Sequence, residues 1–334
     1  MVTITIDNKK IGDGNSIYFV AEAGLNHNGD VKIAKKMIDA AYKCGADAIK
    51  FQTYKAESFL SESSQYFKFF KDVELDFEEF GELNDYAKSI GLTFFSTPFD
   101  VESADYLKQI NVPCFKIASS DLTNVPLLSH IAAMNLPMIV STGLATMQEI
   151  QDAVEICNYH GNKSLALLHC VANYPTVPEE ANMSSIITMR EKFGIPVGYS
   201  DNGDSTLVDL VAASIGADII EKHFTLDRKM EGPDHFFSID PSSLTSLIQQ
   251  IRTIEKIRGD GVKIPQQSEI NNRNVIRKSL TAAIKIRKGE MLTIENVLVK
   301  RPATGIEPKY FSKVIGKQVN KDIEKDTPIT WYDF

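Results

Sequence analysis

Short runs rich in β-branched and aromatic residues alternate with amphipathic segments of helical periodicity along most of this 334-residue chain. Because parallel strands need a long crossover connection, usually a helix, this alternation predicts a parallel sheet covered by helices. The number of runs restricts the fold further. The eight expected strands are Ile17–Glu22, Ala48–Gln52, Thr93–Ser96, Cys114–Ile117, Met138–Ser141, Leu165–His169, Val197–Tyr199 and Ile219–Lys222.

Helical patterns lie between these strands, and eight strand and helix units over roughly 250 residues match a (β/α)8 barrel in number and length. A doubly wound open sheet is the alternative, but it usually has fewer strands, and no glycine-rich dinucleotide fingerprint follows the first strand here. We therefore predict an α/β fold with a TIM barrel over residues 1–260. The expected helices include Val31–Cys44, Phe77–Ile90, Val101–Ile110, Met147–Tyr159, Leu207–Ile215 and Pro241–Ile257.

The composition and the hydrophobic pattern of the sequence change after Gly259. Residues 261–277 are mostly polar and are predicted to be a linker, and residues 278–334 show short strand-like runs broken by turns. A module of this size has little capacity for its own core, so docking onto a barrel is physically reasonable. We predict a small β-rich C-terminal domain.

Composition excludes several classes of function. The net charge of -8 is scattered along the chain without a basic stripe, so nucleic acid is not an expected partner. The first ten residues lack the apolar core of a secretory signal, and no apolar run is long enough to span a membrane. The four cysteines are isolated in apolar surroundings and are expected to be buried free thiols. The expected location is the cytoplasm.

Polar residues gather where the expected strands end, which is where barrel enzymes place their chemistry. Lys50, Lys116 and Lys222 end three different strands and are expected to project into one bowl. Glu22 and Glu221 can balance part of this positive charge, and a bound phosphate and carboxylate can balance the rest. The pattern therefore favours a small, doubly anionic substrate.

Further candidates complete this expected site. Thr97, Ser119 and Ser200 follow strands and can donate hydroxyl hydrogen bonds to an anion. His223 lies beside Glu221 and can act as a metal ligand or a general base, because neutral imidazole can do either.

The motifs, in their order along the chain, resemble the sialic acid synthase family, and the resemblance extends from Tyr18 to the end of the chain. The tail segments Arg277–Leu280 and Arg301–Ile306 resemble that family's C-terminal module, an antifreeze-like (SAF) domain of the β-clip type. The matching barrel motifs are Glu22–Gly29, Lys50–Thr53, Ser96–Asp100, Lys116–Ser119, Ser141–Gly143, Tyr174–Thr176, Glu221–Phe224 and Gly232–His235.

The resemblance implies that phosphoenolpyruvate condenses with the open-chain aldehyde of N-acetylmannosamine and with water, giving N-acetylneuraminate and phosphate. It also implies a domain-swapped homodimer, in which Arg301 of one subunit reaches the sugar site of the other. The implied roles follow the motifs. Lys50, Thr97, Lys116, Ser119 and Ser200, helped by Tyr174, would hold phosphoenolpyruvate, and Glu22, Gln52, Glu221 and Asp234 would face the sugar or the reacting carbons.

The resemblance further implies a divalent metal, Mn²⁺ or Mg²⁺, on His223. The chain departs from the family pattern at the second ligand, because the family's Ser-Asp-His triplet is here Ser200-Asp201-Asn202. An amide oxygen can coordinate a hard cation but lacks the borderline softness of imidazole. We therefore expect Asn202 to be a weak metal ligand, with Asp201 able to turn inward as a substitute.

Three alternatives stay open at this point. The loop at Gly232–His235 resembles the sialic and legionaminic branches, so the sugar could instead be 2,4-diacetamido-2,4,6-trideoxymannose, the precursor of legionaminic acid. A sugar-binding or ice-binding protein that has lost catalysis would explain the altered triplet but not the lysines. An aldolase with a Schiff base on Lys116 would leave the C-terminal module unexplained.

Overall fold

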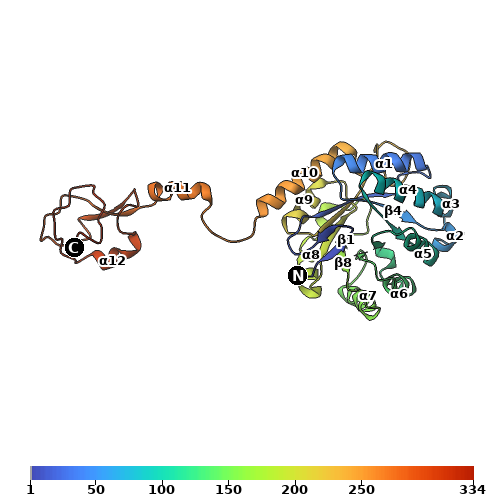
Figure 1. The fold of residues 1–334 in the computed structure, drawn as a ribbon, viewed down its shortest axis with the longest axis horizontal. Helices are drawn as coiled ribbons and strands as arrows, with labels where there is room; N and C mark the ends of the chain where they lie inside the picture. The colour runs from blue at the N-terminus through green and yellow to red at the C-terminus, as the bar shows by residue number, and fades with distance from the viewer. Residues whose placement is uncertain (1) are drawn as a thin grey trace. The chain divides into compact units, whose positions relative to one another are not determined.

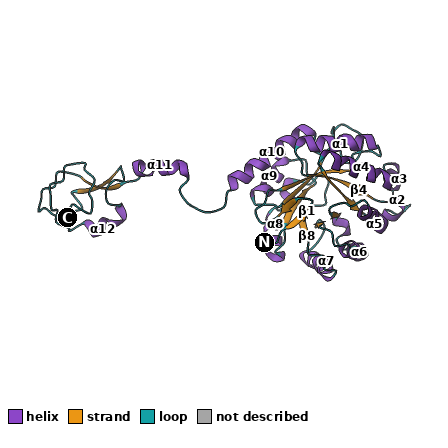
Figure 2. Ribbon diagram, viewed as in Figure 1, coloured by secondary structure: helices purple, strands orange, loops and turns teal. Residues whose placement is uncertain are grey.

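The computed structural model describes residues 2–334 and contains a closed barrel of eight parallel strands, surrounded by helices (Figures 1 and 2). The strands follow each other around the barrel in chain order, and the last one pairs with the first. This confirms the TIM-barrel prediction. The barrel strands are β3 (Tyr18–Gly24), β4 (Ala48–Thr53), β5 (Thr93–Pro98), β6 (Phe115–Ile117), β7 (Met138–Ser141), β8 (Leu165–Cys170), β9 (Val197–Asp201) and β10 (Ile219–His223).

The helices begin and end at residues suited to capping. Asp30 accepts a hydrogen bond from the Lys32 amide at the start of α1, and Gly45 ends that helix with a left-handed φ of 86°. Asp76 and Glu79 form a capping box at the start of α4. The barrel helices are α1 (Val31–Cys44), α4 (Phe77–Ile90), α5 (Val101–Gln109), α6 (Val125–Ala133), α7 (Met147–Tyr159), α8 (Ser184–Phe193), α9 (Thr206–Ser214) and α10 (Pro241–Arg258).

Alternate strand residues face either the barrel interior or the helices, because the side-chain period of a strand is two. Val20, Phe95 and Leu168 belong to the apolar cluster that fills the barrel, whereas Phe19 and Phe94 pack in the larger cluster beneath the helices. The interior cluster also includes a hairpin that the sequence did not indicate. Its strands are β1 (Ile4–Ile6) and β2 (Lys9–Ile11), and its isoleucines are buried with the interior residues.

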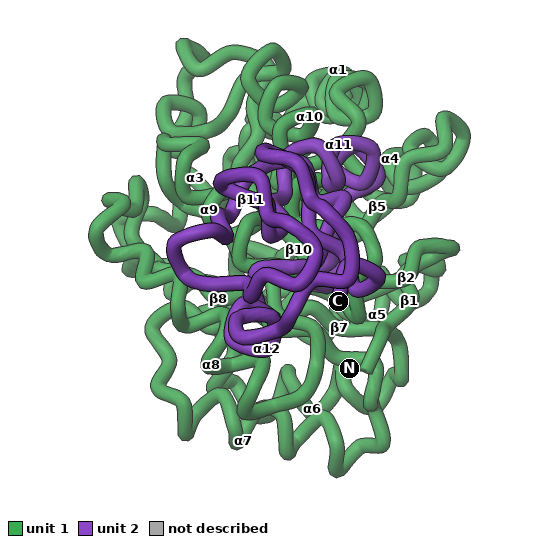
Figure 3. The backbone as a smooth tube through the Cα atoms, turned by 90° about the vertical axis from the view of Figure 1, so that its left-hand side faces the viewer, with its two compact units in different colours: residues 1–259 green, residues 260–334 purple. Residues whose placement is uncertain are grey.

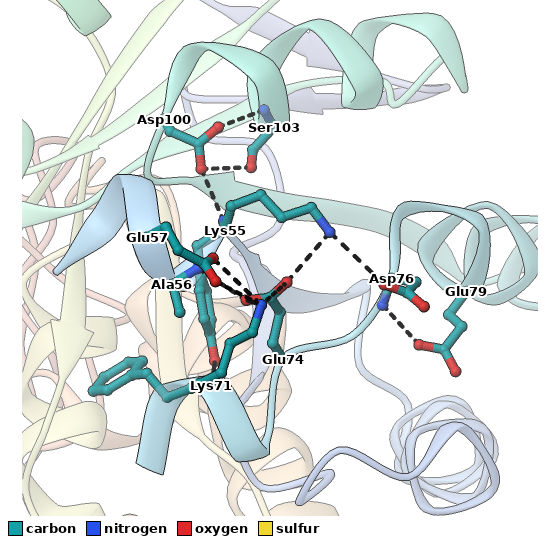
Figure 4. Close-up of polar contacts among 11 residues, drawn as sticks. Lys55, Ala56, Glu57, Lys71, Glu74, Asp76, Glu79, Asp100 and Ser103 are labelled. Atoms are coloured by element: carbon teal, nitrogen blue, oxygen red, sulfur yellow. Dashed lines mark hydrogen bonds and ion pairs between the residues drawn. The ribbon is translucent and has the colours of Figure 1, made fainter. Parts of the chain in front are cut away.

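An excursion of about twenty residues separates β4 from α4 and carries two short helices, α2 (Ala56–Phe59) and α3 (Phe67–Asp72). Figure 4 shows the ion network that fastens its two ends together. The nearly buried carboxylate of Glu74 accepts a hydrogen bond from the Ala56 amide at 2.9 Å and pairs with Lys55 and Lys71. The excursion is therefore held closed at its base.

The chain divides into two compact units, one ending at Gly259 and the other comprising Asp260–Phe334, which Figure 3 draws in different colours. The segment expected to be a linker contains a ten-residue helix, α11 (Gln267–Ile276). Beyond it, β11 (Ser279–Ala282) and β12 (Val297–Lys300) pair antiparallel, followed by α12 (Phe311–Val314). The other strand-like runs form only single bridges.

The C-terminal unit has its own small core, in which Leu280, Ile286 and Val297 are buried together.

All four cysteines are buried and free, as expected. Across residues 2–334, no helix is both long and apolar enough to cross a membrane.

Candidate active site

A cavity of about 340 Å³ lies where the barrel strands end in their following loops. It brings together eleven of the fifteen residues that the sequence singled out as site candidates, and these come from seven strands or the loops after them. The cavity is lined by Glu22, Lys50, Gln52, Thr97, Phe99, Lys116, Ala118, Ser119, Ser120, Ser141, Leu144, Cys170, Ala172, Tyr174, Ser200, Asn202, Glu221 and His223.

Two lysines and two glutamates form a buried charge network at the bottom of this cavity. The ammonium nitrogen of Lys50 lies 2.8 Å from Glu22 Oε2 and 3.8 Å from Glu221 Oε2. Lys116 lies 3.2 Å from the other oxygen of Glu221, which also accepts a hydrogen bond from Ser200 at 2.9 Å. The charges therefore compensate one another until an anionic ligand can compete for the lysines.

Burial and these neighbours shift the protonation of the four groups in different directions. Burial raises the pKa of Glu22 to about 7, although Lys50 opposes the shift. Burial acts on Glu221 in the same sense, but Lys116 and Lys50 outweigh it and lower the pKa of Glu221. Burial lowers the pKa of Lys116, whereas the two glutamates overcome burial and raise the pKa of Lys50. Glu22 is thus the carboxyl that titrates near neutrality.

Amide and hydroxyl groups surround the charged network. Gln52 Nε2 donates to Glu22 Oε1 at 3.3 Å, and Lys50 Nζ donates to Thr97 Oγ1 at 3.1 Å. Ser119 Oγ accepts a hydrogen bond from the Gly143 amide at 3.0 Å, so its hydroxyl proton points to another acceptor, which is the neighbouring Cys170 or a bound ligand.

His223 and Asn202, the two predicted metal ligands, both line the cavity. Burial lowers the pKa of His223 to about 3, so its imidazole is neutral, and its Nδ1 is buried without a hydrogen-bond partner. Asn202 Nδ2 donates to the Val171 carbonyl at 2.8 Å and to Cys170 Sγ at 3.3 Å, which leaves the amide oxygen available. These two donors fit a divalent cation that takes its other ligands from substrate or water. Between residues 2 and 334, no cluster of three or more His, Cys, Asp or Glu side chains is arranged to hold a metal.

Of the three remaining candidates, one lines the cavity, one lies on a neighbouring loop and one belongs to the other unit. Tyr174 lines the cavity and contacts His223 edge to face, with ring centroids 5.8 Å apart. Asp234 is partly buried on the loop after β10, where burial raises its pKa to about 6. After burial itself and Cys170, the charge of Asp234 helps to raise the pKa of Tyr174, so the two side chains are neighbours. Arg301 is exposed on the C-terminal unit.

The expectation that Lys222 projects into the same bowl is wrong. Its ammonium group is buried on the helix side of β10, paired with Asp201 and with Asp209 of α9. Because neighbouring strand residues point to opposite faces, Glu221 and His223 cannot face the cavity unless Lys222 faces away from it. The suggestion that Asp201 turns inward as a substitute metal ligand fails for the same reason.

Several residues of the cavity wall had been given no role from the sequence, although Ser141 and Phe99 lie in two of the matching motifs. The hydroxyl of Ser141 is buried without a partner, and Cys170 lies close enough to Ser119 and Ser200 for hydrogen bonding. Both occupy the last inward position of their strands, so the period of two could have identified them. Phe99 and Leu144 come from loops, for which no strand periodicity predicts a direction.

The barrel, its charged cavity at the strand ends and the appended small domain define a TIM-barrel enzyme with a C-terminal accessory module. The NeuB family model matches residues 37–263, and the SAF domain model matches residues 277–334. The chain belongs to the NeuB family, as its motifs predicted.

Relatives with assigned names agree with this membership. The chain is 40% identical to an N,N'-diacetyllegionaminic acid synthase of Campylobacter jejuni, covering 92% of this chain and 97% of the relative. It is 38% identical to the Legionella pneumophila enzyme of the same name, over 97% and 96% of the two chains. Among solved structures, the crystal structure of the N-acetylneuraminic acid synthetase of Leptospira borgpetersenii, in complex with citrate, superposes on this chain with a TM-score of 0.79. The match has 41% sequence identity and covers 82% of this chain and 97% of the Leptospira chain.

Proposed function

We propose that this protein condenses phosphoenolpyruvate with the open-chain aldehyde of an N-acetylated amino sugar, giving a nine-carbon 2-keto acid and inorganic phosphate. The observation that carries the proposal is the convergence of Lys50 and Lys116 in one cavity. Both ammonium groups are nearly inaccessible to solvent and pair with Glu221, and Lys50 also pairs with Glu22. Such a pair suits a small ligand that carries both a phosphate and a carboxylate.

In the proposed reaction, C3 of phosphoenolpyruvate bonds to the aldehyde carbon, and the aldehyde oxygen takes up a proton. Water adds at C2 and gives up its protons, and the bond from C2 to the phosphate oxygen breaks with its electron pair leaving on phosphate. Positive charge develops at C2, where the ionised carboxylate of Glu221 is stabilising. Glu22, which titrates near neutrality, is suited to take the proton from the attacking water.

His223 and Asn202 would hold a divalent cation, Mn²⁺ or Mg²⁺. When bound, such a cation supplies Lewis-acid polarisation of the aldehyde oxygen. The protein's contribution is a neutral imidazole and an amide oxygen whose nitrogen is already fixed by Val171.

Exchanging the residue at position 202 should change the metal requirement. We expect Asn202→Ala to need about tenfold more Mn²⁺ for half-maximal turnover, and Asn202→His to need less, since imidazole binds borderline metals more tightly than an amide oxygen. Titration of the chelated enzyme with Mn²⁺ measures both. Equal requirements in all three proteins would remove Asn202 from the metal site.

For the sugar, we propose 2,4-diacetamido-2,4,6-trideoxymannose as the preferred substrate. Two relatives named as legionaminic acid synthases share 38% and 40% identity with nearly the whole chain. In addition, Phe99, Leu144 and Ala172 give the cavity an apolar wall, which suits a second acetamido methyl group and a 6-deoxy carbon. N-acetylmannosamine is the second candidate, supported by the name of the Leptospira structure.

A phosphate-release assay with each sugar, with and without Mn²⁺, tests the proposal. We expect phosphate only when phosphoenolpyruvate and a sugar are both present, with the higher kcat/KM for the diacetamido sugar. Borohydride trapping with pyruvate should leave Lys116 unmodified. Covalent trapping without phosphate release would instead indicate a Schiff-base aldolase. The absence of phosphate release with every amino sugar would indicate a binding protein.

We also propose that the protein acts as a homodimer in which the C-terminal unit of one chain completes the site of the other through Arg301. In support, the segment around α11 exposes apolar side chains that a second chain could cover, including Ile264, Ile270 and Val275.

Complementation between two inactive variants tests this exchange. Mixed Arg301→Ala and Lys116→Met chains, reassociated at equal amounts, should recover about a quarter of the wild-type activity, because half of the dimers would hold one intact site. Each variant alone should stay inactive. If the mixture gained nothing although mixed dimers formed, Arg301 would serve its own chain.

A further inference from the structure

The helix side of β9 and β10 holds a second charge cluster, separate from the cavity. The Lys222 ammonium group pairs with Asp201 and lies 3.1 Å from Asp209 Oδ2, and each of the three side chains is at most 1% exposed. Burying two carboxylates with one lysine is costly, and apolar residues of similar size would often be more stabilising. Stability alone therefore explains the cluster poorly.

The cluster is hydrogen-bonded to the turn that follows β9. Lys222 Nζ donates to the Gly203 carbonyl at 3.1 Å, and Asp201 Oδ1 accepts from the Gly203 amide at 2.8 Å. A Cβ atom at Gly203 would lie only 3.0 Å from Asp201 Oδ1 and 3.0 Å from the Thr176 carbonyl, so a side chain there would require these neighbours to shift. Both polar backbone groups of this one residue are held by buried charges.

From Gly203 the contacts continue to the cavity. The Asn202 carbonyl accepts from the Thr176 amide at 3.1 Å, and Asn202 Nδ2 donates to the Val171 carbonyl. Thr176 Oγ1 in turn donates to the Asn173 carbonyl at 2.8 Å, which closes the loop that carries Tyr174. The turns after β8 and β9 are thus joined at Asn202.

We infer that Lys222, Asp201 and Asp209 are positioning residues that set the place of Asn202 and Tyr174 in the cavity. This inference rests on the proposed function, since it assigns the cluster to the sugar side of that reaction. Four of the residues expected to hold phosphoenolpyruvate, namely Lys50, Thr97, Lys116 and Ser119, come from other strands. Ser200 precedes Asp201 but is fixed separately by its hydrogen bond to Glu221 at 2.9 Å, so only the auxiliary contact of Tyr174 depends on the cluster.

Two variants of the cluster and one matched control test the inference. Lys222→Met removes the hydrogen bond from Lys222 to the Gly203 carbonyl. Asp201→Asn keeps the ion pair between Lys222 and Asp209, so the Asp201→Asn protein should fold even if Lys222→Met does not. The control is Asp218→Asn, at the other end of the same strand pair. Asp218 is also a buried carboxylate, which accepts from the Val197 amide at 3.0 Å and pairs with Arg190 at 3.5 Å.

For both cluster variants we expect kcat to fall by roughly tenfold to a hundredfold, because small misplacements at a reacting centre have effects of that size. The calorimetric Kd for phosphoenolpyruvate should stay within about threefold of wild type, since that side of the site is held elsewhere. Asp218→Asn should lower Tm while leaving kcat within about twofold, because it lies away from the reacting groups.

Hydrogen exchange followed by mass spectrometry gives a readout independent of turnover. Peptides covering residues 171–177 and 201–206 should exchange faster in Lys222→Met and in Asp201→Asn, but not in the control. Wild-type kcat and unchanged exchange in the cluster variants would overturn the inference. If the wild-type protein releases no phosphate with any sugar, the proposed function fails, and exchange in the two loops still decides whether the cluster positions them.

Discussion

Replacing Lys116 by methionine is expected to lower kcat/KM for phosphoenolpyruvate by about 30- to 5,000-fold. The Lys116 ammonium group is nearly buried and lies 3.2 Å from Glu221 Oε1. Truncating one member of a buried hydrogen-bonded charge pair costs about 2–5 kcal/mol, which corresponds to this range of rates. Steady-state phosphate release measures the effect, and calorimetric titration with phosphoenolpyruvate shows how much of it is lost binding.

Lys55→Met is the matched control for that experiment. Lys55 also pairs with carboxylates, 3.3 Å from Glu74 and 3.7 Å from Asp76, but it belongs to the excursion between β4 and α4 and does not line the cavity (Figure 4). A partly exposed pair of this kind contributes about 1 kcal/mol or less, so kcat/KM should change little. Equal losses in both variants would show that Lys116 has no special role toward the substrate.

Glu22→Gln should lower kcat by about 10²- to 10⁴-fold, the range expected for loss of a well-placed general base. The pH dependence of the wild-type enzyme should identify the same group. Burial raises the pKa of Glu22 to about 7, so the carboxyl is protonated below that pH and cannot accept a proton. We therefore expect kcat/KM to fall about tenfold per pH unit as the pH drops below 7.

The residual activity of Glu22→Gln provides the control for this assignment, because its kcat/KM should not fall as the pH drops below 7. Glu221 cannot produce that fall near neutrality, since Lys116 and Lys50 overcome the effect of burial and lower its pKa. An acidic fall that persists unchanged in Glu22→Gln would assign the titration to another group, such as the substrate phosphate.

Much of the fold was evident from patterns that depend on local geometry. The limits expected for α1, α4, α7 and β7 agree with the structure, because apolar residues at helical or strand spacing and good caps define them. Most barrel strands extend one or two residues further at their C-terminal ends than expected. Several of those extra residues are polar or small, as at Gly24, Thr53 and Asp201, and pairing with the neighbouring strand rather than side-chain hydrophobicity keeps them in the sheet.

The elements that went unpredicted depend on contacts between distant parts of the chain. The β1 and β2 hairpin is three residues per strand, too short for a clear periodic signal, and it is stabilised by burying Ile4, Ile6 and Ile11 within the barrel. The excursion after β4 is likewise held by the Glu74 network, whose members are separated along the sequence.

The chemistry of the site could be read largely from residue types at the strand ends, because strands of a barrel bring their ends together whatever their distance along the chain. That rule placed Glu22, Lys50, Lys116 and Glu221 in one cavity. Only the tertiary structure decided which face of the sheet each side chain occupies and which carboxyl titrates near pH 7. Lys222 and Glu221 are adjacent in sequence yet lie on opposite faces of the sheet. Glu22 differs from Glu221 because Lys116 pairs directly with Glu221 but offsets the burial of Glu22 only weakly, and because the charge of Glu221 adds to that burial.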